Sequence, residues 1–259
     1  MQLDLSGRHA LVCGASQGIG RASAIELAEL GANVTLLARS TDALRTVAES
    51  LPRAHAGQHH DWRSVDMLDT ASLQATATAI AAGEPVHILI NNTGGPPGGP
   101  ASTATAAEFE SAFRQHLLGG QVLLQALLPG MRASGYGRIV NVISTSVKEP
   151  IAGLGVSNTV RAAVAGWAKT LSGELAADGI TVNNVLPGYT HPSRLDGLLA
   201  AKAAASGQGE DEIAQGLIAT IPARRFGEAG EVAAVSAFLC TPAAAYVNGV
   251  SIAVDGGRT

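Results

Sequence analysis

A glycine-rich turn at residues 14–20 separates two apolar segments, and it restricts the fold of this chain more than any other feature. An apolar run over residues 9–13 leads into the turn, and an apolar-periodic segment over residues 19–30 follows it, which predicts strand, turn and helix. Such a turn points the unpaired N–H groups of a helix N-terminus at one place, where they can bind a phosphate. A Cβ atom there would block a positive φ or keep the anion away. The stretch alone also fits an ordinary strand-to-helix connection, but its place at the start of an α/β chain favours a nucleotide.

Strand-like apolar runs alternate with helical patterns along the rest of the chain. We expect strands at 9–13, 32–38, 59–65, 87–90, 138–143, 181–185 and 251–254. We expect helices at 19–30, 41–50, 70–82, 106–132, 157–177 and 231–240. Repeated βα units predict an α/β fold, in which a doubly wound, mostly parallel sheet carries helices on both faces. We expect one domain over residues 1–259, with its ligand beyond the carboxyl ends of the strands, where the strand order reverses.

The composition excludes several classes of protein. The net charge is −4 and no basic run occurs, so nucleic acid is not an expected partner. The two cysteines, Cys13 and Cys240, have no metal-like spacing, and no disulfide framework or metal site is expected. The start of the chain does not resemble a signal peptide, and no apolar run approaches the roughly 20 residues of a membrane span. We therefore predict a cytoplasmic protein that does not enter a membrane.

Several motifs occur together in a fixed order. They are Gly14-x3-Gly18-x-Gly20, Asn91-Asn92-Thr93-Gly94, the strand 138–144, the segment 181–188, and Val254-Asp255-Gly256-Gly257. In this combination the chain resembles the short-chain dehydrogenase/reductase family over its whole length. The resemblance implies a Rossmann-like fold with about seven parallel strands, a nicotinamide cofactor and a small-molecule substrate. Relatives commonly form tetramers through two long helices and the C-terminal strand, so a homotetramer or homodimer is expected. Residues 121–131 and 162–175 would allow this, although they could instead face the sheet.

The end of the second strand bears on the choice of cofactor. A carboxylate there would bind the adenosine ribose and select NAD, but the sequence has Ala38-Arg39-Ser40. A guanidinium suits a 2′-phosphate, so NADP is favoured and NAD remains open; Gln17 stands where NADP-preferring relatives often have a basic residue. The residues that the turn and the resemblance together assign to the cofactor are Gly14, Ser16, Gln17, Gly18, Ile19, Gly20, Arg39, Asp66, Met67, Asn92, Gly94, Pro187, Gly188 and Thr190.

The catalytic pattern of the family is altered in this sequence. Members usually carry a Ser, a Tyr about 13 residues later and a Lys four residues beyond, and the ammonium lowers the pKa of the phenol. Here the same count gives Ser144, Ser157 and Arg161, and His116 stands in place of the family's relay Asn. A serine hydroxyl is a poor acid at neutral pH, and an arginine stays charged, so this pair cannot exchange protons as Tyr and Lys do.

Three interpretations follow from the altered set. In the first, the protein is an oxidoreductase whose acid is His116, Lys148 or a water held by Ser157 and Arg161. In the second, Ser144 and Arg161 polarise a carbonyl and solvent supplies the proton. In the third, the chain binds the cofactor without turnover, as a sensor or a partner subunit. The substrate would be a carbonyl or an alcohol, and its identity cannot be read from the fold.

Two other segments are expected near the substrate. The Gly/Pro-rich loop 94–100 is stiffened by its prolines and allows close backbone approach at its glycines, so we place it as one wall of the substrate site. The helical, polar segment 190–226 is expected to form a lid over the site. Its alternative is a solvated surface insertion.

Overall fold

Seven parallel strands form the central sheet of the computed structural model, which describes residues 1–191, 203, 207 and 209–259. The strand order is β3-β2-β1-β4-β5-β6-β9, so the order reverses between β1 and β4. The strands are β1 (His9–Cys13), β2 (Asn33–Ala38), β3 (His60–Ser64), β4 (Ile88–Asn91), β5 (Gly137–Val142), β6 (Ile180–Pro187) and β9 (Ser251–Val254). This is the predicted α/β sheet, and the predicted strand ends differ from the observed ends by no more than two residues.

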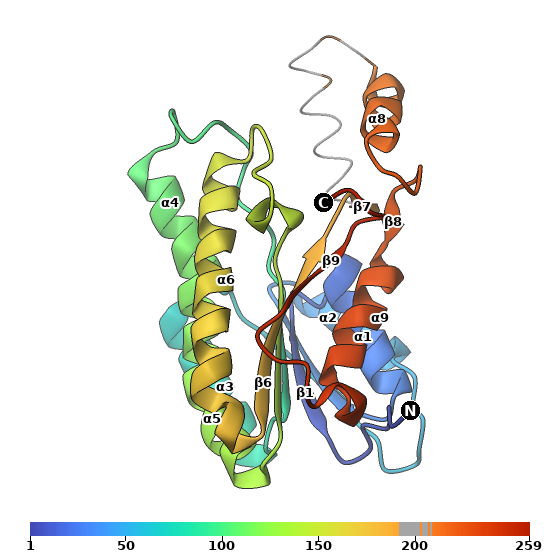
Figure 1. The fold of residues 1–259 in the computed structure, drawn as a ribbon. Helices are drawn as coiled ribbons and strands as arrows, with labels where there is room; N and C mark the ends of the chain where they lie inside the picture. Colours follow the sequence, from blue (N-terminus) through green and yellow to red (C-terminus); the bar gives the residue numbers. More distant parts are fainter. Residues whose placement is uncertain (192–202, 204–206, 208) are drawn as a thin grey trace.

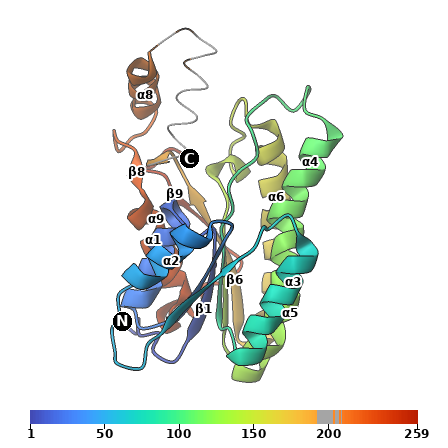
Figure 2. The ribbon, with the colours of Figure 1, turned by 180° about the vertical axis from the view of Figure 1, so that it is seen from behind.

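Helices cover both faces of the sheet, as Figures 1 and 2 show from opposite sides. One face carries α1 (Gly18–Glu29), α2 (Thr41–Ser50) and α9 (Ala229–Cys240). The other carries α3 (Thr70–Gly83), α4 (Ala106–Phe113), α5 (Gly119–Ser134) and α6 (Gly155–Leu175). A π-helical turn, Arg114–Leu118, joins α4 to α5, so the predicted helix over 106–132 is one helical segment with a wider turn inside it.

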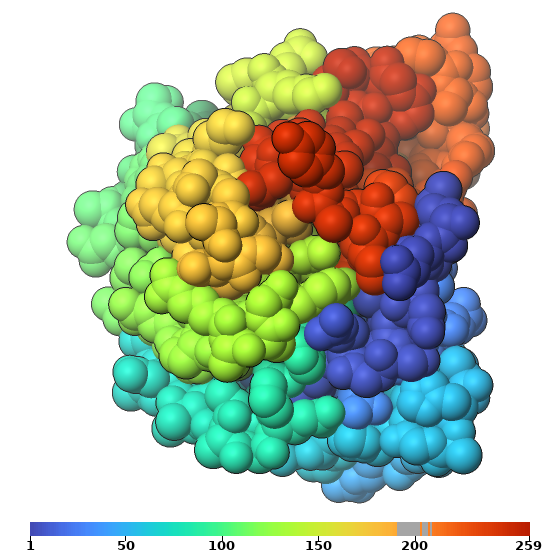
Figure 3. Space-filling view, turned by 60° about the horizontal axis from the view of Figure 1, so that its bottom comes forward, coloured from blue at the N-terminus to red at the C-terminus, as the bar shows by residue number. Residues whose placement is uncertain are grey.

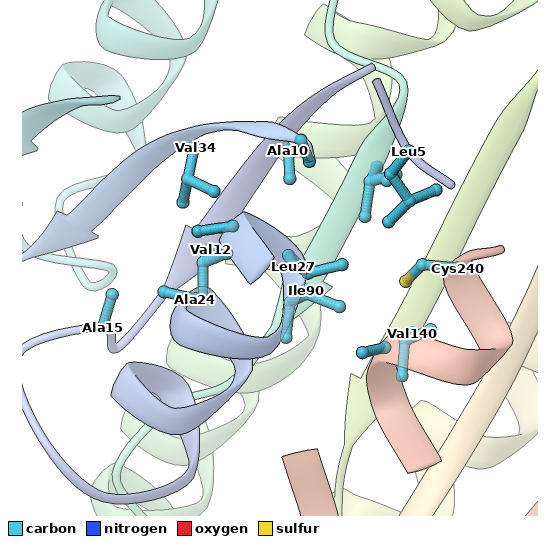
Figure 4. Packing of buried hydrophobic residues seen from close by; sticks show 14 of the residues in the cluster. Leu5, Ala10, Val12, Ala15, Ala24, Leu27, Val34, Ile90, Val140 and Cys240 are labelled. Carbon is cyan, nitrogen blue, oxygen red and sulfur yellow. The ribbon is translucent and has the colours of Figure 1, made fainter. Parts of the chain in front are cut away.

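Each face of the sheet has its own apolar core. Residues from β1, β2 and β4 pack with α1 in the first core, where Val12, Leu27 and Ile90 are fully buried (Figure 4). The second core lies under α3, α5 and α6, and includes Leu73, Leu123 and other leucines. Because β-strand side chains alternate between faces, Leu11 and Val12 enter different cores. Both cores hold the helices against the sheet, and this packing sets the positions of the strand ends.

The predicted lid begins beyond the carboxyl ends of the strands. Its described parts include β7 (Thr190–His191) and α8 (Glu210–Ala219), and β7 pairs with β8 (Gly227–Glu228), which directly follows the predicted lid. Figure 1 shows α8 above the sheet, beside the end that carries the C-terminus. Residues 192–202, 204–206 and 208 of the predicted lid lie outside the described residues, so the lid stays a prediction.

The opposite edge of the sheet, where the strands begin, is closed by paired polar side chains. The His9 N–H donates to Nδ1 of His87 over 3.1 Å, and His9 Nε2 lies 2.8 Å from Thr35 Oγ1. Tyr136 Oη donates to the Cys240 carbonyl over 2.6 Å. Figure 3, which brings this edge forward, shows the N-terminal residues beside the residues that follow α9. A hydrogen bond from Ala243 N to Gln2 O joins these two segments.

Candidate functional site

A single cleft of about 930 Å³ lies at the carboxyl ends of the strands, near the reversal of strand order. This is within the size range of small-molecule and cofactor sites. Of the predicted cofactor residues, the cleft is lined by Gly14, Ser16, Gln17, Gly18, Ile19, Arg39, Asp66, Met67, Asn92, Gly94, Pro187, Gly188 and Thr190. Three of the four predicted catalytic residues also line it, namely Ser144, Ser157 and Arg161. The fold therefore gathers residues from most of the chain around one space.

The glycine turn is held closely against the end of β4. Gly14 has a φ of +60°, and a Cβ atom on it would lie 2.5 Å from the Asn92 carbonyl oxygen. The Asn92 side-chain amide donates to the carbonyls of Cys13 and Gly14, each over 3.4 Å. A Cβ on Gly20 would lie 2.2 Å from the Gly14 carbonyl oxygen. Gly20 is not among the residues that line the cleft, and its contribution is to let α1 start directly beneath the turn.

The start of α1 presents backbone donors to the cleft. No side chain caps this helix end, and Gly18 and Ile19 of its first turn line the cleft. The first N–H groups of a helix have no partner within the helix and carry partial positive charge, so they attract an anion. The helix is 12 residues long and packs against α9, which fixes its direction. The turn and the helix together have the geometry that the predicted anion site requires, and the site itself stays a prediction.

Positive charge predominates along the cleft. Among the described residues that line it, Arg39, Arg161 and Arg258 are cationic, and Asp66 is the one acidic residue. Arg39 is exposed and follows β2, where Ser64 Oγ donates to its carbonyl over 2.8 Å. Asp66 follows β3, and its Oδ1 accepts the Leu68 N–H over 3.0 Å. A polyanionic ligand with one end between Arg39 and Asp66 matches this charge distribution.

Ser144, Ser157 and Arg161 converge at the other end of the cleft. Ser144 follows β5, and its Oγ accepts the Ser146 N–H over 3.1 Å, which leaves its hydroxyl proton available. Ser157 and Arg161 lie four residues apart on one face of α6, and they are 2% and 3% exposed. Arg161 Nη1 donates to the Val142 carbonyl at the end of β5, over 3.1 Å. The buried hydroxyl of Ser157 and the buried guanidinium of Arg161 therefore line the cleft together with the half-buried Ser144.

The loop 94–100 is joined to the segment that starts α6. Gly99 N donates to the Gly153 carbonyl over 2.6 Å, and Gly155 N donates to the Gly99 carbonyl over 2.9 Å. Gly94 and Gly95 line the cleft, together with Leu154 from the facing segment. The predicted wall is thus partly formed by this loop, and the loop also sets the start of the helix that carries Ser157.

Two predicted proton donors lie outside the cleft wall. His116 is 8% exposed and lies in the π-helical turn, where its Nδ1 is in short hydrogen-bond contact with Thr93 Oγ1. Thr93 itself lines the cleft, so it stands between His116 and the ligand space. Lys148 is exposed and is not among the described residues that line the cleft. The geometry therefore retains His116 as a candidate that acts through Thr93 and disfavours Lys148.

Some cleft residues were not singled out by the sequence patterns. Thr93 lies within the motif Asn91–Gly94, and Tyr189 lies between the predicted residues Gly188 and Thr190, but neither was assigned a role of its own. Their position two residues after a strand end is the signal that could have identified them. Arg258 has its guanidinium carbon 5.0 Å from the centre of the Tyr189 ring. Gln115 and Arg258 enter the cleft from the π-helical turn and the C-terminus, and no local pattern marks either residue.

A parallel sheet with a glycine turn at its switch point and an uncapped helix facing a cationic cleft defines a nucleotide-binding protein of the Rossmann type. A family model described as Enoyl-(Acyl carrier protein) reductase matches residues 14–259. The chain belongs to the short-chain dehydrogenase/reductase family.

Similar proteins agree with this assignment over nearly the whole chain. The 3-oxoacyl-(acyl-carrier-protein) reductase FabG of Vibrio cholerae is 32% identical over 258 residues, which cover 98% of each protein. The NADPH-dependent reductase BacG of Bacillus subtilis is 30% identical over 262 residues, again with 98% of each covered. L-sorbose reductase from Gluconobacter frateurii, solved with NADPH and L-sorbose, superposes with a TM-score of 0.92 at 29% identity, covering 100% of this chain and 98% of that one.

Two further properties of the described residues are relevant here. No helix among them is long and apolar enough to cross a bilayer. Within the same residues, no group of three or more His, Cys, Asp or Glu side chains is arranged to hold a metal ion.

Proposed function

We propose that this protein is an NADP(H)-dependent oxidoreductase that interconverts a carbonyl compound and an alcohol, with an atypical set of catalytic residues. The observation that carries the proposal is the continuity of the cleft. The anion-binding turn at Gly14–Gly20 and the group formed by Ser144, Ser157 and Arg161 line the same space. A cofactor bound along this space would bring its reactive end to those side chains.

The residues present fit NADP. The turn and the start of α1 suit the pyrophosphate, because backbone N–H groups there have no side-chain cap. Arg39 suits the 2′-phosphate, since a guanidinium binds phosphate oxygens in pairs and remains charged. Asp66 and Met67 would hold the adenine, Asn92 and Gly94 the ribose, and Pro187, Gly188 and Thr190 the nicotinamide. BacG is named as NADPH-dependent and the sorbose reductase was solved with NADPH, which supports the same choice here.

The protein's own residues would prepare the substrate oxygen. A bound nicotinamide supplies hydride to, or accepts it from, the substrate carbon. The Ser144 hydroxyl, which retains its proton, can donate to the substrate oxygen. The Arg161 guanidinium stabilises the negative charge that develops on that oxygen, and its burial strengthens the effect because little water competes. Ser157, on the same helix face, would help to hold the oxygen in place.

The test is turnover of a panel of compounds, followed by absorbance of the nicotinamide. L-sorbose and a 3-oxoacyl thioester represent the substrates in the names of the relatives, and simple ketones and alcohols complete the panel. We expect consumption of NADPH with at least one carbonyl compound, and a loss of about 100-fold or more in Ser144→Ala, as is typical when an oxyanion donor is removed. NADPH binding, measured by fluorescence, should be retained in that variant.

A different result would favour the second class of function. If the wild type binds NADPH but turns over no compound, and Ser157→Tyr with Arg161→Lys creates activity, the protein is a binding subunit or sensor. If neither NADPH nor NADH binds, both functions are excluded.

Assembly as a homotetramer or homodimer is part of the proposal. Leu123, Leu127 and Leu171 of the expected interface helices pack into the core, so these residues face the sheet. Phe113 and Leu118, at the junction of α4 and α5, are about 40% exposed and offer apolar surface for a partner copy. Light scattering after size-exclusion chromatography would test this. A cytoplasmic location remains a prediction from the sequence.

A further inference from the structure

The contact between Thr93 and His116 connects the cleft to the interior behind it. Thr93 Oγ1 and His116 Nδ1 are in hydrogen-bond contact, and the imidazole is almost completely buried. Thr93 lines the cleft, whereas His116 lines a second, much smaller cavity. A hydroxyl that faces ligand space on one side and an imidazole on the other can pass a proton between them.

The sheet register places Thr93 beside Ser144. Strands β4 and β5 are parallel neighbours, and Asn91 is paired with Asn141. Thr93 lies two residues beyond Asn91, and Ser144 lies three residues beyond Asn141, so both leave the same edge of adjacent strands. Neighbouring strands are about 4.8 Å apart, which brings the two hydroxyl-bearing residues to one part of the cleft. Both residues line the cleft, so we place a substrate oxygen that is held by Ser144 within reach of Thr93.

The small cavity behind His116 suits one water molecule. It measures about 10 Å³ and is lined by polar residues that include Asn91, His116, Asn141 and Arg161. A buried water needs roughly 10–15 Å³ and two to four polar partners. Asn91 Nδ2 donates to Asn141 Oδ1 over 2.9 Å, while Asn91 Oδ1 is buried and has no hydrogen-bond partner in the described part of the chain. This acceptor points to a water at that place.

The packing of α5 brings His116 to this position. A Cβ atom on Gly119 would lie 3.0 Å from Met67 Cε, and one on Gly120 would lie 3.4 Å from Asn91 Nδ2. The two glycines thus allow the helix to approach β4 closely. The π-helical turn that precedes them widens the helix at His116.

Apart from His116, the charged side chain among the residues that line this cavity is Arg161 from α6, and Asn91, Asn141 and Met67 come from β4, β5 and the segment after β3. A guanidinium keeps its protons at neutral pH, so Arg161 does not take part in the transfer. The imidazole of His116 can relay a proton, because one ring nitrogen releases a proton while the other takes one up.

We infer that Thr93 and His116 form a proton relay, in which Thr93 is the catalytic proton donor and His116 and the cavity water replenish it. The inference rests on the proposed oxidoreductase function and specifies the proton donor of that site. Ser144 and Arg161 then bind the substrate oxygen, and the missing tyrosine is replaced by a hydroxyl from a different strand.

In the direction of carbonyl reduction, every proton and electron pair of the proposed relay is accounted for. The carbonyl carbon gains hydride, the C=O π bond breaks, and the oxygen keeps the electron pair. In one concerted transfer, that oxygen takes the hydroxyl proton of Thr93 while Thr93 takes the proton of His116 Nδ1. No threonine alkoxide forms, so the weak acidity of an aliphatic hydroxyl does not limit the step. The other ring nitrogen of His116 takes a proton from the cavity water, which recovers one from solvent. Alcohol oxidation runs the same transfers in reverse.

The kinetic test compares Thr93→Val with Thr93→Ser, using the panel compound that the wild type reduces fastest. Valine has the shape of threonine without the hydroxyl, so we expect kcat to fall by about 100-fold, the lower end for loss of a general acid. Serine keeps the hydroxyl and should restore kcat to within about threefold of wild type. Both variants should bind NADPH with unchanged affinity. Thr159→Val, the same substitution on the exposed face of α6, is the control and should leave kcat unchanged.

A spectroscopic test does not depend on turnover. In histidine labelled with ¹⁵N, the signals of His116, assigned by their absence in His116→Gln, report which ring nitrogen carries the proton. We expect Thr93→Val to shift these signals and Thr93→Ser to leave them close to wild type. The signals of His9 and His87, which lie at the opposite edge of the sheet, should not move.

The possible outcomes separate the relay from the proposed function. A wild type that turns over a substrate while Thr93→Val retains its kcat overturns the relay alone. Unchanged His116 signals in Thr93→Val likewise exclude the coupling of the two side chains. A wild type without any turnover overturns the proposed function, and the catalytic role of Thr93 with it. Loss of kcat in Thr93→Val with recovery in Thr93→Ser and shifted His116 signals supports the relay.

Discussion

The two edges of the sheet use similar polar residues for opposite purposes. At the amino edge, the guanidinium groups of Arg8 and Arg138 pack over the Tyr136 ring, with their central carbons 3.9 and 4.0 Å from the ring centre. Arg138 Nη1 also donates to the carbonyls of Gly137 and Gly179. At the carboxyl edge, Arg39 is exposed to the cleft and Arg161 reaches it from α6. Cationic side chains therefore fill space at one edge and line open space at the other.

Structural and functional polar residues in this fold differ in whether their hydrogen-bond partners line the cleft. At the amino edge, His87 Nδ1 accepts the His9 N–H and His9 Nε2 lies beside Thr35 Oγ1, and neither histidine lines the cleft or the small cavity. His116, in contrast, contacts a hydroxyl that lines the cleft. A buried histidine is informative about function when its partner reaches ligand space.

The largest effect is expected from Gly20→Ala, which changes the carboxyl edge alone. The new Cβ would lie 2.2 Å from the Gly14 carbonyl oxygen, so the turn must move. Overpacking of this kind typically costs about 1–3 kcal/mol, and we expect NADPH affinity to fall by about 100-fold. Fluorescence titration with NADPH measures this affinity. Gly166→Ala in α6, where a Cβ meets nothing within 4 Å, is the control and should bind NADPH normally.

Tyr136→Phe should change the amino edge alone. The substitution removes the donor to the buried Cys240 carbonyl, which we expect to lower the free energy of unfolding by about 1–3 kcal/mol. Urea denaturation measures this loss, and NADPH affinity should be unchanged. Tyr246→Phe is the matched control, because Tyr246 is fully exposed and its loss should stay within about 0.5 kcal/mol. Equal losses in the two variants would contradict the structural role of Tyr136.

Arg39→Ala tests the cofactor preference at the carboxyl edge. Loss of a charge-assisted contact at an exposed position should weaken NADPH binding by about tenfold, or about 1.4 kcal/mol, and leave NADH binding nearly unchanged. Arg53→Ala, another exposed arginine, serves as the control. If both cofactors weaken equally, Arg39 does not contact a 2′-phosphate.

The smallest expected effect is a pH dependence that comes from the amino edge. Burial lowers the pKa of His9 and of His87 below the ordinary value of 6.5. Between the lowered pKa and 6.5 the unfolded chain binds more protons, so stability is complete above pH 6.5 and declines as the pH falls. Urea midpoints at pH 7.5, 6.5 and 5.5 should decrease in that order. His87→Gln should reduce the slope, and a slope of the opposite sign would exclude this origin.

The sequence predicted the fold well because the fold is encoded locally. The apolar run before Gly14 and the period after it define a strand and a helix without any distant contact. The same holds for Asn91–Gly94 and for the segment around Pro187, whose positions after strand ends place them at one edge. The cleft residues were predictable for the same reason, since carboxyl ends of parallel strands meet.

What the sequence did not predict depends on contacts between distant segments. Thr93 and His116 are 23 residues apart, and the depth of a helix against the sheet decides whether they touch. The start of the helix at Gly155 and the loop at Gly99 meet through backbone bonds, which side-chain patterns do not reveal. Arg258 reaches the cleft because the C-terminus returns to it.

The backbone pairing of Gly99 with the segment Gly153–Gly155 also bears on how the residues proposed for catalysis could be replaced during evolution. Because main-chain atoms fix the start of α6, the positions of residues 157 and 161 do not depend on which side chains occupy them. Side chains with different chemistry can then be exchanged at those two positions while the frame that presents them stays the same. The backbone thus presents whichever side chains stand at these two positions to the cleft. A tyrosine at position 157 and a lysine at position 161 should therefore line the same part of the cleft that Ser157 and Arg161 line now.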